Sequence, residues 1–443
     1  MASVNGESPD NFLFLQASGG TGKTYLTNLL LAKIRLGGNV ALAVASSGIA
    51  ATLLLGGRTA HSCFKLPLNL VTNPEPTCNI RKNSSLADVL RAAKLIVWDE
   101  ISMAHRGGLE ALDRSLRDIR NCDKMFGGVT VLICGDFQQI LPVVTKGTPA
   151  DELKACVKSS PLWNKVSVMT LRRNMRVHIT GNPEGGRWAA KLLQLDQGNI
   201  PTNADDEIDL TTLGVNIVNS GQELQSKIYP NLEDNYKKSD WLRDRAILAP
   251  RNDIVEQINA SLMERVPGES VVYRSYDQTT ELSEACAYPM EFLNSLNPPG
   301  LPQHQLTLKE GCPIILLRNL DAPRLMNGTS LIVKCLMRNV IVATILTGVA
   351  EREDVLIPRI SLIPSDFFVE FKRMQFPVKP AFCLTVNKSQ GQTMKYVGLH
   401  LNPGVFSHGQ MFVGCSRCGS PENLYIYANG TRAKNIVYQQ AIR

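Results

Sequence analysis

Short runs of apolar residues alternate with amphipathic stretches over roughly the first 180 residues of the chain. The apolar runs lie at residues 12–15, 40–45, 95–98, 129–134 and 166–171. Runs of this length are typical of buried parallel strands, and the segments between them have the periodicity of crossover helices. The pattern therefore predicts an α/β fold with a parallel sheet.

Two of the intervening segments have a clear helical period. The first, residues 23–36, ends at Gly37-Gly38 and is expected to place on one face Leu26, Leu29, Leu30 and Ile34. The second, residues 108–120, has an apolar stripe of Leu109, Leu112, Leu116 and Ile119. Its polar face, expected to point outward, holds Glu110, Asp113, Arg114 and Arg117. Both helices should pack one side against the sheet.

Changes in the pattern suggest how the chain is organised. A stretch rich in Pro, Asn and Thr interrupts the first region at about residues 64–90, and short β-branched runs with turn residues fill residues 306–360. An α/β pattern then resumes to residue 443. We expect a first lobe at 1–178, a second lobe at 179–305 and 361–443, and a β-rich insertion at 306–360.

Composition narrows the class of protein. Of the 443 residues, 44% are apolar and 20% are charged, which excludes a fibrous or disordered chain. Lys and Arg exceed Asp and Glu by seven, a bias that permits a polyanionic partner without requiring one. No membrane segment is expected, because the uncharged stretch 36–57 contains five glycines and several polar residues. Eleven irregularly spaced cysteines, including Cys415 and Cys418, predict neither a disulfide framework nor a zinc site.

The segment Ala17-Ser-Gly-Gly-Thr-Gly-Lys-Thr24 lies between an apolar strand and an amphipathic helix, the context of a phosphate-binding loop. Backbone N–H groups of such a loop surround the β-phosphate, a lysine reaches the β- and γ-phosphates, and a hydroxyl binds Mg²⁺. The residues expected to contact the nucleotide are Gly19, Gly20, Thr21, Gly22, Lys23 and Thr24. Ala17 stands where such loops usually have their first glycine, so the backbone φ at this position is expected to be negative, as alanine prefers. The alternative is a structural glycine turn.

Two further polar segments follow apolar strands. Asp99 and Glu100 come directly after residues 95–98; we expect Asp99 to hold Mg²⁺ and Glu100 to orient or deprotonate the attacking water. Gln139, in Gly135-Asp-Phe-Gln-Gln139, is placed to sense the γ-phosphate or that water. Alone, an Asp-Glu pair is a weak signal and the Gln segment could be a surface turn, but their order after the loop strengthens both.

The phosphate-binding loop, the Asp-Glu pair and the Gln139 segment are part of a longer series of short motifs along the chain. It continues with Ser46-Ser-Gly-Ile-Ala-Ala51, Arg58-Thr-Ala-His61, Asp99-Glu-Ile-Ser-Met-Ala-His105, Phe126-Gly-Gly128, Leu171-Arg-Arg-Asn-Met-Arg176, Thr385-Val-Asn-Lys-Ser-Gln-Gly-Gln-Thr393 and Ser407-His-Gly-Gln410. The series resembles the motifs of the Pif-one-like, RecD-related superfamily 1 DNA helicases. It is most similar to the helicase region encoded by Helitron transposable elements. The resemblance covers nearly all of residues 12–443.

The resemblance implies two RecA-like lobes that bind ATP and Mg²⁺, with an SH3-like module at 306–360. It implies that Arg176 and Arg417 neutralise charge on the transferring γ-phosphoryl group, for which a guanidinium is well suited. It also places Gly391, after Gln390, in the motif that couples the γ-phosphate to DNA. Without the resemblance, either arginine would be read as a solvated surface residue.

The resemblance further implies contacts to single-stranded DNA. The residues concerned are Thr385, Asn387 and Lys388 in the second lobe and Ser47, Thr59, His61 and Phe64 in the first. Hydroxyl, amide and ammonium groups can bind phosphate oxygens, and His61 and Phe64 could stack on bases. From the residues alone, Phe64 would be a core residue and His61 a satisfied polar one.

The sequence thus predicts an ATP- and Mg²⁺-dependent DNA helicase that moves 5′-to-3′ by resemblance, as a monomer on single-stranded and duplex DNA. The family implies a nuclear location and a role in repair, recombination, telomere maintenance or Helitron transposition. The alternative is a remnant that binds nucleotide or single-stranded DNA without unwinding. A GTPase is discounted, because Asn387-Lys388 is followed by Ser389 and Gln390 rather than a guanine-reading pattern.

Two departures from the relatives shape these expectations. Relatives have a glutamine-bearing, adenine-reading segment before the first strand, and the eleven residues before Phe12 contain no glutamine. Complete Helitron proteins also carry a nuclease with a His-x-His pair, and none of the six histidines forms such a pair. We therefore expect the motor module alone.

Overall fold

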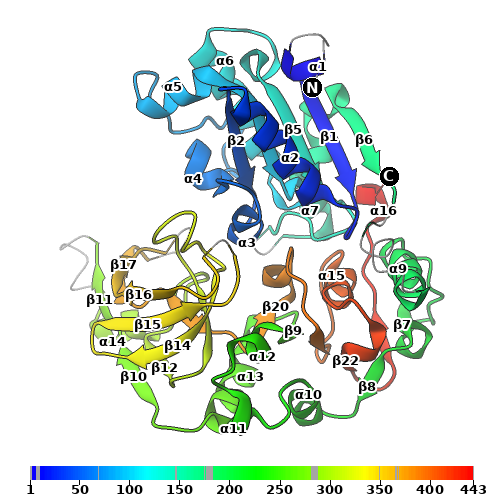
Figure 1. Cartoon of the computed structure of the whole chain (residues 1–443), viewed down its shortest axis with the longest axis vertical. Helices are drawn as coiled ribbons and strands as arrows, with labels where there is room; N and C mark the ends of the chain where they lie inside the picture. The colour runs from blue at the N-terminus through cyan, green and yellow to red at the C-terminus, as the bar shows by residue number, and fades with distance from the viewer. Residues whose placement is uncertain are drawn as a thin grey trace. The chain divides into compact units, whose positions relative to one another are not determined.

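The structure is a computed structural model that describes residues 2–5, 10–67, 69–144, 147–173, 175, 183–280, 288–348, 350–364, 367 and 369–442. The chain divides into two compact units (Figure 1). Unit 1 comprises Met1–Gly214, Gly404–Pro421 and Thr431–Arg443, and unit 2 comprises Val215–Pro403 and Glu422–Gly430. No helix in the described part of the chain is long and apolar enough to cross a membrane.

Unit 1 is built on a parallel sheet with the strand order β3-β2-β4-β5-β1-β6. The strands are β1 (Phe12–Ala17), β2 (Val40–Ala45), β3 (Arg58–Thr59), β4 (Ala93–Asp99), β5 (Thr130–Gly135) and β6 (Ser167–Leu171). The five strands expected from the apolar runs are therefore confirmed. Strand β3 was not predicted, because two residues are too few to give a recognisable pattern. Ala17 ends β1 in extended backbone, as its position required.

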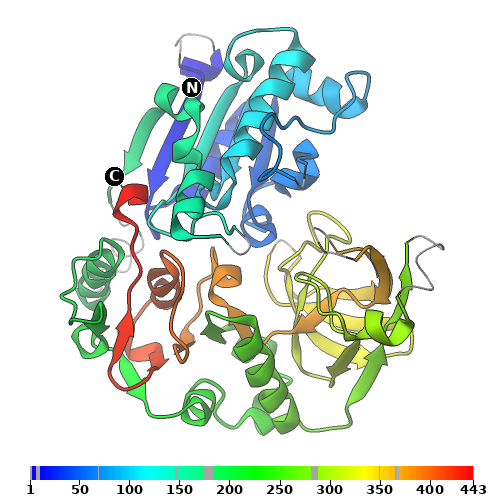
Figure 2. The ribbon, with the colours of Figure 1, turned by 180° about the vertical axis from the view of Figure 1, so that it is seen from behind.

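Helices cover both faces of this sheet. The helices of unit 1 are α1 (Ala2–Asn5), α2 (Lys23–Leu36), α3 (Gly48–Thr52), α4 (Ala60–Phe64), α5 (Ser85–Ala92), α6 (Arg106–Arg120), α7 (Pro149–Ala155), α9 (Pro183–Asp196), α15 (Gln410–Ser416) and α16 (Gln439–Ile442). Helix α2 lies on the face seen in Figure 1, and α6 lies on the face seen in Figure 2. Short 3-10 turns are η1 (Ile101–Met103), η2 (Met125–Gly128), η3 (Val157–Ser159), η4 (Pro161–Lys165) and η5 (Leu210–Leu213). A small antiparallel pair joins β7 (Glu207–Asp209) to β23 (Arg432–Lys434).

Helix α2 has the predicted limits, but its buried face differs from the predicted one. The buried residues are Thr27, Leu31 and Ile34, whereas Leu29 is 54% exposed. Thr27 can face the core because its hydroxyl donates to the carbonyl oxygens of Lys23 and Thr24 within the helix. A stripe drawn through leucines alone misses such a threonine.

Helix α6 confirms the predicted stripe and corrects one polar position. Leu109, Leu112 and Leu116 are fully buried. Asp113, which we expected to point outward, is only 6% exposed. Its carboxylate accepts hydrogen bonds from the backbone N–H of Phe126 at 2.6 Å and from Arg117 Nε at 3.1 Å. A buried carboxylate with two donors is satisfied, so the charge can lie inside.

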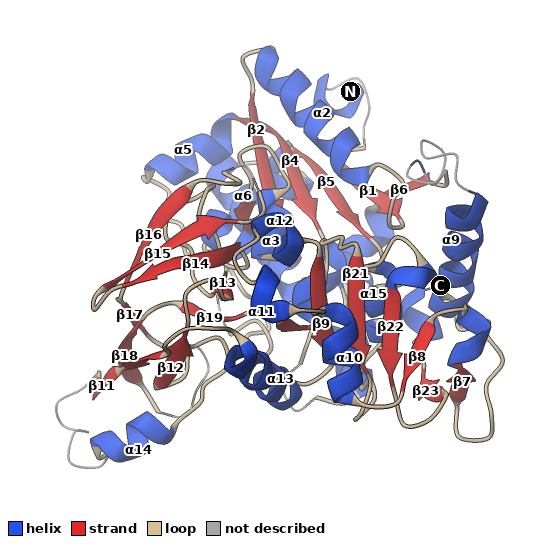
Figure 3. Cartoon of the chain, turned by 60° about the horizontal axis from the view of Figure 1, so that its bottom comes forward, coloured by secondary structure: helices blue, strands red, loops and turns tan. Residues whose placement is uncertain are grey.

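Unit 2 contains a second parallel sheet, with the order β20-β9-β21-β22-β8 (Figure 3). Its strands are β8 (Asn216–Val218), β9 (Arg245–Ala249), β20 (Cys383–Thr385), β21 (Tyr396–His400) and β22 (Leu424–Tyr427). The helices are α10 (Gly221–Ile228), α11 (Leu232–Asn235), α12 (Ser239–Arg243) and α13 (Asn252–Arg265), with the 3-10 turns η7 (Val386–Ser389) and η8 (Pro421–Asn423). Two parallel sheets agree with the predicted α/β class.

Antiparallel strands form the rest of unit 2. They are β10 (Val271–Arg274), β11 (Tyr276–Thr279), β12 (Gln305–Leu308), β13 (Pro313–Leu316), β14 (Ser330–Leu336), β15 (Val340–Ile345), β16 (Asp354–Pro358), β17 (Ile360–Leu362), β18 (Phe371–Gln375) and β19 (Val378–Pro380), with helix α14 (Met290–Ser295) beside them. The largest sheet has the order β16-β15-β14-β13-β19. Antiparallel pairing thus extends beyond the predicted residues 306–360 on both sides, because β10, β11, β18 and β19 pair with strands inside that range or with each other.

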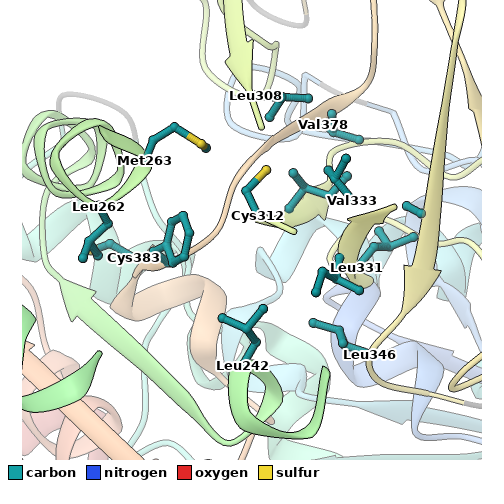
Figure 4. Close-up of a cluster of buried hydrophobic side chains, with 14 of the residues drawn as sticks. Leu242, Leu262, Met263, Leu308, Cys312, Leu331, Val333, Leu346, Val378 and Cys383 are labelled. Carbon is teal, nitrogen blue, oxygen red and sulfur yellow. The ribbon is translucent and has the colours of Figure 1, made fainter. Parts of the chain in front are cut away.

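One hydrophobic core holds the two parts of unit 2 together. Figure 4 shows Leu262 and Met263 of α13 and Cys383 of β20 on one side, facing Leu331 and Val333 of β14 on the other. All five side chains are buried. Because the core is continuous, the antiparallel strands and the parallel sheet hold each other in place.

A buried ion pair fixes the strands next to α14. Arg373 on β18 and Asp277 on β11 are both fully buried, with Nη2 2.7 Å from Oδ2. The remaining guanidinium donors bond to the carbonyl oxygens of Pro302 at 3.1 Å and Leu293 at 3.0 Å. Each of the three guanidinium nitrogens therefore donates a hydrogen bond, and the pair links two strands, a loop and a helix.

Asp277→Ala is expected to lower the free energy of unfolding by about 3–5 kcal/mol, because it leaves the Arg373 charge buried without a partner. Asp354→Ala is the matched control, since its ion pair with Lys334 is exposed to solvent and should contribute no more than about 1 kcal/mol. Urea unfolding of the two variants measures the difference. Equal losses would contradict the role given to the buried pair.

Candidate functional site

The loop between β1 and α2 has the backbone of a phosphate cradle. Gly20 and Gly22 adopt φ of 84° and 89°, values that favour glycine. A side chain added at Gly19 would meet no atom within 4 Å, so the space beside it is open. The loop is held by Thr21, which is buried and whose N–H and hydroxyl both donate to the Ser18 carbonyl. Gly22 caps α2 without a side chain, so the first N–H groups of the helix face the loop.

Lys23 connects this loop to the end of β4. Its Nζ lies 2.7 Å from Asp99 Oδ1 and 2.8 Å from Glu100 Oε1, and both carboxylates are buried. Burial alone would lower the pKa of Lys23, but the two carboxylates outweigh it and raise the pKa, so the ammonium stays charged. The structure therefore brings together three residues that the sequence placed in one site, although 75 positions separate Lys23 from Asp99.

Glu100 adopts an unusual backbone conformation. Its φ and ψ are 52° and 45°, in the left-handed region that non-glycine residues seldom occupy. Its N–H donates to Asp99 Oδ1 at 2.8 Å, which stabilises the turn. Strain of this kind is concentrated at functional sites. The turn sends the Asp99 and Glu100 side chains to the same ammonium group.

Gln139 follows β5, in a loop organised by Asp136. Both residues are buried, and Gln139 Nε2 lies 3.3 Å from Asp136 Oδ2. Burial raises the pKa of Asp136 to about 6, and the charges of Lys23 and Glu100 also act on it. Asp136 thus belongs to the same electrostatic cluster. Our sequence reasoning missed it, although its place directly after a buried strand, like that of Asp99, was an available signal.

Residues 407–410 pack on this loop from a distant part of the chain. His408 is fully buried; its Nδ1 accepts from the N–H of Tyr438 at 3.0 Å, so Nε2 bears the proton and donates to the Phe137 carbonyl at 2.9 Å. Gly409, with φ of 72°, lies against the backbone of Gln138 and Gln139. The start of α15 is therefore fixed to the Gln139 loop, a contact that the sequence did not indicate.

Gly409→Ala is expected to destabilise unit 1 by about 1–3 kcal/mol, because the added Cβ would lie 2.8 Å from the Gln138 carbonyl oxygen and the φ is strained for alanine. Gly419→Ala is the control, since a side chain there meets no atom within 4 Å. Thermal unfolding of both variants checks this. An unchanged Tm in Gly409→Ala would show that the close approach is not maintained in solution.

Of the two arginines predicted to act on the γ-phosphoryl group, the structure describes Arg417 but not Arg176. Arg417 directly follows α15 and is 7% exposed, so it is not the solvated residue that its sequence alone suggests. Its Nε donates to the Val413 carbonyl at 2.9 Å and its Nη2 to Ser416 Oγ at 2.8 Å. It lies in the same compact unit as Lys23, although we expected it in the second lobe. Arg176 lies outside the described residues.

One of the four residues of unit 1 that were predicted to contact DNA does not have the position that this role requires. Phe64 is fully buried, with its ring 5.8 Å from that of Trp98, so it is a core residue and cannot stack on a base. His61, one turn earlier on α4, is exposed. Ser47 and Thr59 cap α3 and α4 by accepting hydrogen bonds from Ala50 and Ser62. Their hydroxyl hydrogens can still donate to a phosphate.

The residues predicted in unit 2 lie in and around η7. Thr385 is buried at the end of β20, and Asn387 and Lys388 are half-buried in the turn itself. Gly391, just beyond it, has φ of 84°. The turn is held by Ser389, whose hydroxyl donates to the Val386 carbonyl at 2.7 Å. The four residues thus share one ordered segment at the carboxyl end of a parallel strand, where ligands bind in α/β sheets.

Two family models match this chain. Residues 1–206 match the PIF1-like helicase family, and residues 291–336 match the 2B domain of the DNA helicase Pif1. The first match covers a little less than half of the chain. The chain is therefore similar to the PIF1-like helicase family in these two segments. The 2B match falls within the antiparallel part of unit 2 and includes α14 and β12 to β14.

The chain is also similar to curated relatives over most of its length. It is 25% identical over 418 residues to the ATP-dependent DNA helicase PIF1 of Xenopus laevis and 25% identical over 425 residues to that of Homo sapiens. Each alignment covers 94% of this chain and 58% of the relative. The chain therefore spans little more than half the length of these relatives.

Solved structures of PIF1-like proteins share its fold. Bacteroides Pif1 bound to ssDNA gives a TM-score of 0.73 at 23% identity, covering 99% of this chain and 92% of that one. Pif1 helicase from Candida albicans gives 0.69 at 22% identity, covering 97% and 94%. These likenesses confirm the predicted α/β class with two parallel sheets and a β-rich insertion.

Proposed function

We propose that this chain is an ATP-dependent DNA helicase that moves along a single DNA strand and separates the duplex ahead of it. The observation on which this rests is the buried cluster of Lys23, Asp99 and Glu100, with nitrogen–oxygen distances of 2.7 and 2.8 Å. This cluster joins a phosphate-binding loop to two carboxylates. Similarity to the curated relatives supports the assignment, since they are named ATP-dependent DNA helicases.

The chemistry follows from the residues of the cluster. A triphosphate seated on Gly19 to Thr24 competes with the two carboxylates for the Lys23 ammonium, which would then neutralise β- and γ-phosphate oxygens. Glu100, released from that ion pair, can accept a proton from the attacking water. The water oxygen then bonds to the γ-phosphorus as the bond to the β-phosphate oxygen breaks, which yields ADP and phosphate.

The residues present also fit a magnesium ion. The Thr24 hydroxyl and the Asp99 carboxylate are oxygen donors of the kind Mg²⁺ prefers, and both lie next to Lys23 in sequence or in space. When bound, the ion would neutralise charge on the phosphates. Arg417 is proposed to add positive charge at the γ-phosphoryl group, and Arg176 to do the same from its position outside the described residues.

Contacts to DNA complete the proposal. Ser47, Thr59 and His61 of unit 1 and Thr385, Asn387 and Lys388 of unit 2 are proposed to hold the strand, with Gly391 coupling it to the γ-phosphate. Cycles of ATP binding and hydrolysis would alternate the grip of the two units on the phosphates. We further propose, by resemblance, a first lobe at 1–178, a second lobe at 179–305 and 361–443, and an SH3-like insertion at 306–360. The resemblance also leads us to propose monomeric action, a nuclear location, a role in DNA repair, recombination or telomere maintenance, and a Helitron origin.

Strand separation tests this proposal directly. With ATP and Mg²⁺, the chain is expected to release a labelled strand from a duplex with a 5′ single-stranded tail and to leave a 3′-tailed duplex intact. Release from the 3′-tailed duplex alone would reverse the polarity. Binding to both substrates without release of either would favour a remnant that holds DNA without unwinding it.

A further inference from the structure

Three cations gather where the parallel sheet of unit 2 meets its antiparallel strands. Lys388 lies in η7, Lys379 lies in β19, and Arg318 lies two residues after β13. Strands β13 and β19 are paired, with Ile315 opposite Lys379, and the next backbone bond joins Leu317 N–H to the Pro377 carbonyl at 2.8 Å. All three side chains are half-buried.

In the part of the chain that the structure describes, these cations are not held in ion pairs. In the described residues, none of the ion pairs includes Arg318, Lys379 or Lys388. The Arg318 guanidinium donates to the Leu317 carbonyl at 3.3 Å. The carboxylate that acts on Lys379 belongs to Glu256, which is exposed on α13. Three partly desolvated like charges repel one another, and a bound anion would remove that penalty.

The electrostatics of Lys388 show that the three groups act together. Burial is the largest influence, followed by the charges of Lys379 and Arg318, and together they lower the pKa of Lys388 to about 8. Burial also lowers the pKa of Lys379 and of Arg318. A negative ligand at this place would raise the pKa of Lys388 again, so binding should be coupled to proton uptake.

We propose that Arg318, Lys379 and Lys388 form a three-cation clamp that binds adjacent phosphates of a single DNA strand. The proposal rests on the proposed helicase function and deepens it, since the sequence pointed to Lys388 alone. A single-stranded backbone carries one negative charge per nucleotide, so three cations match consecutive phosphates rather than one. The contact is independent of sequence, as translocation along DNA requires.

The pH dependence of binding tests the clamp. The dissociation constant for a fluorescent oligodeoxycytidine is measured from about pH 7 to about pH 9.5, a range in which its bases do not titrate. Below pH 8 Lys388 is charged in the free protein, so affinity should be constant. Above pH 8 the free protein loses that proton while the complex keeps it, so the dissociation constant should rise up to about tenfold per pH unit.

Variants distinguish the clamp from an isolated lysine. Lys388→Arg should bind with no change across this pH range, because a guanidinium stays charged. Arg318→Gln and Lys379→Gln should each shift the onset of the loss to higher pH, since each removes a repelling charge from Lys388. Each should also reduce the slope of log affinity against log salt by about 0.7. Lys334→Gln, on the exposed ion pair with Asp354, should change neither quantity.

The outcomes separate this proposal from the broader one. The clamp is refuted if single-stranded DNA binds wild type without a pH-dependent loss, or if Arg318→Gln and Lys379→Gln keep the wild-type onset and salt slope. In either case the helicase assignment stands. If wild type binds no single-stranded DNA, both proposals fail together. Binding of an ATP analogue should be unchanged in all four variants, and a loss there would also contradict a DNA-specific clamp.

Discussion

Replacing Arg417 by alanine is expected to slow ATP hydrolysis by about 10³- to 10⁵-fold while nucleotide binding is retained. The reason is that a guanidinium at the γ-phosphoryl group stabilises charge that develops in the transition state more than charge present in bound ATP. Steady-state ATPase assays and titration with a fluorescent ATP analogue measure the two quantities separately. Arg417→Lys should recover little, since an ammonium cannot replace the planar fork.

The control for Arg417 must separate catalysis from folding. Arg417 also bonds to Val413 and Ser416, so thermal unfolding of each variant should accompany the kinetics. Arg187→Ala is a suitable matched variant, because Arg187 is an exposed arginine on α9, which packs against α15. Turnover in Arg417→Ala within tenfold of Arg187→Ala would refute the assigned role.

Lys23→Ala is expected to lower turnover by about 10²- to 10³-fold and to weaken nucleotide binding as well. Lys23 would contact phosphates in both the bound and the transition state, so both quantities depend on it. The substitution also leaves the buried carboxylates of Asp99 and Glu100 without their shared cation. Without that cation the two adjacent carboxylates repel each other, which opposes the ionised form of Glu100 that is proposed to accept a proton.

Lys33→Ala controls for the loss of a lysine from α2. Lys33 is exposed in the last turn of the same helix, so its removal should leave turnover and nucleotide affinity unchanged. The same ATPase assay and analogue titration apply. Nucleotide affinity in Lys23→Ala equal to that in Lys33→Ala would mean that the loop does not bind the phosphates.

Features formed by one continuous stretch of sequence could be predicted, because the residues within that stretch determine their conformation. The phosphate loop, its flanking strand and α2 occupy one stretch, and the glycines at 20 and 22 take the positive φ that such a loop requires. The meeting of Lys23 with Asp99 and Glu100 was also predictable, because carboxyl ends of parallel strands share one edge of a sheet. The resemblance to a helicase family supplied the order of the remaining motifs.

Features that depend on tertiary neighbours were not predictable. Whether Phe64 turns toward DNA or toward Trp98 is decided by packing, and it turns inward. Asp113 looks solvated on a helical wheel, but the backbone N–H of Phe126 gives it a buried partner. The proximity of Arg318 to Lys379 depends on β13 pairing with β19, which lies more than 60 residues away in the sequence. Periodicity contains no information about such pairings.

The rate of ATP hydrolysis, measured on the wild-type chain with Mg²⁺ in the absence and presence of single-stranded DNA, tests the central assignment most directly. The account predicts slow turnover alone and at least about tenfold stimulation by DNA, because the segment around Gly391 is proposed to couple the bound strand to the γ-phosphate. Hydrolysis that is absent under both conditions, or that is equal with and without DNA, would contradict it.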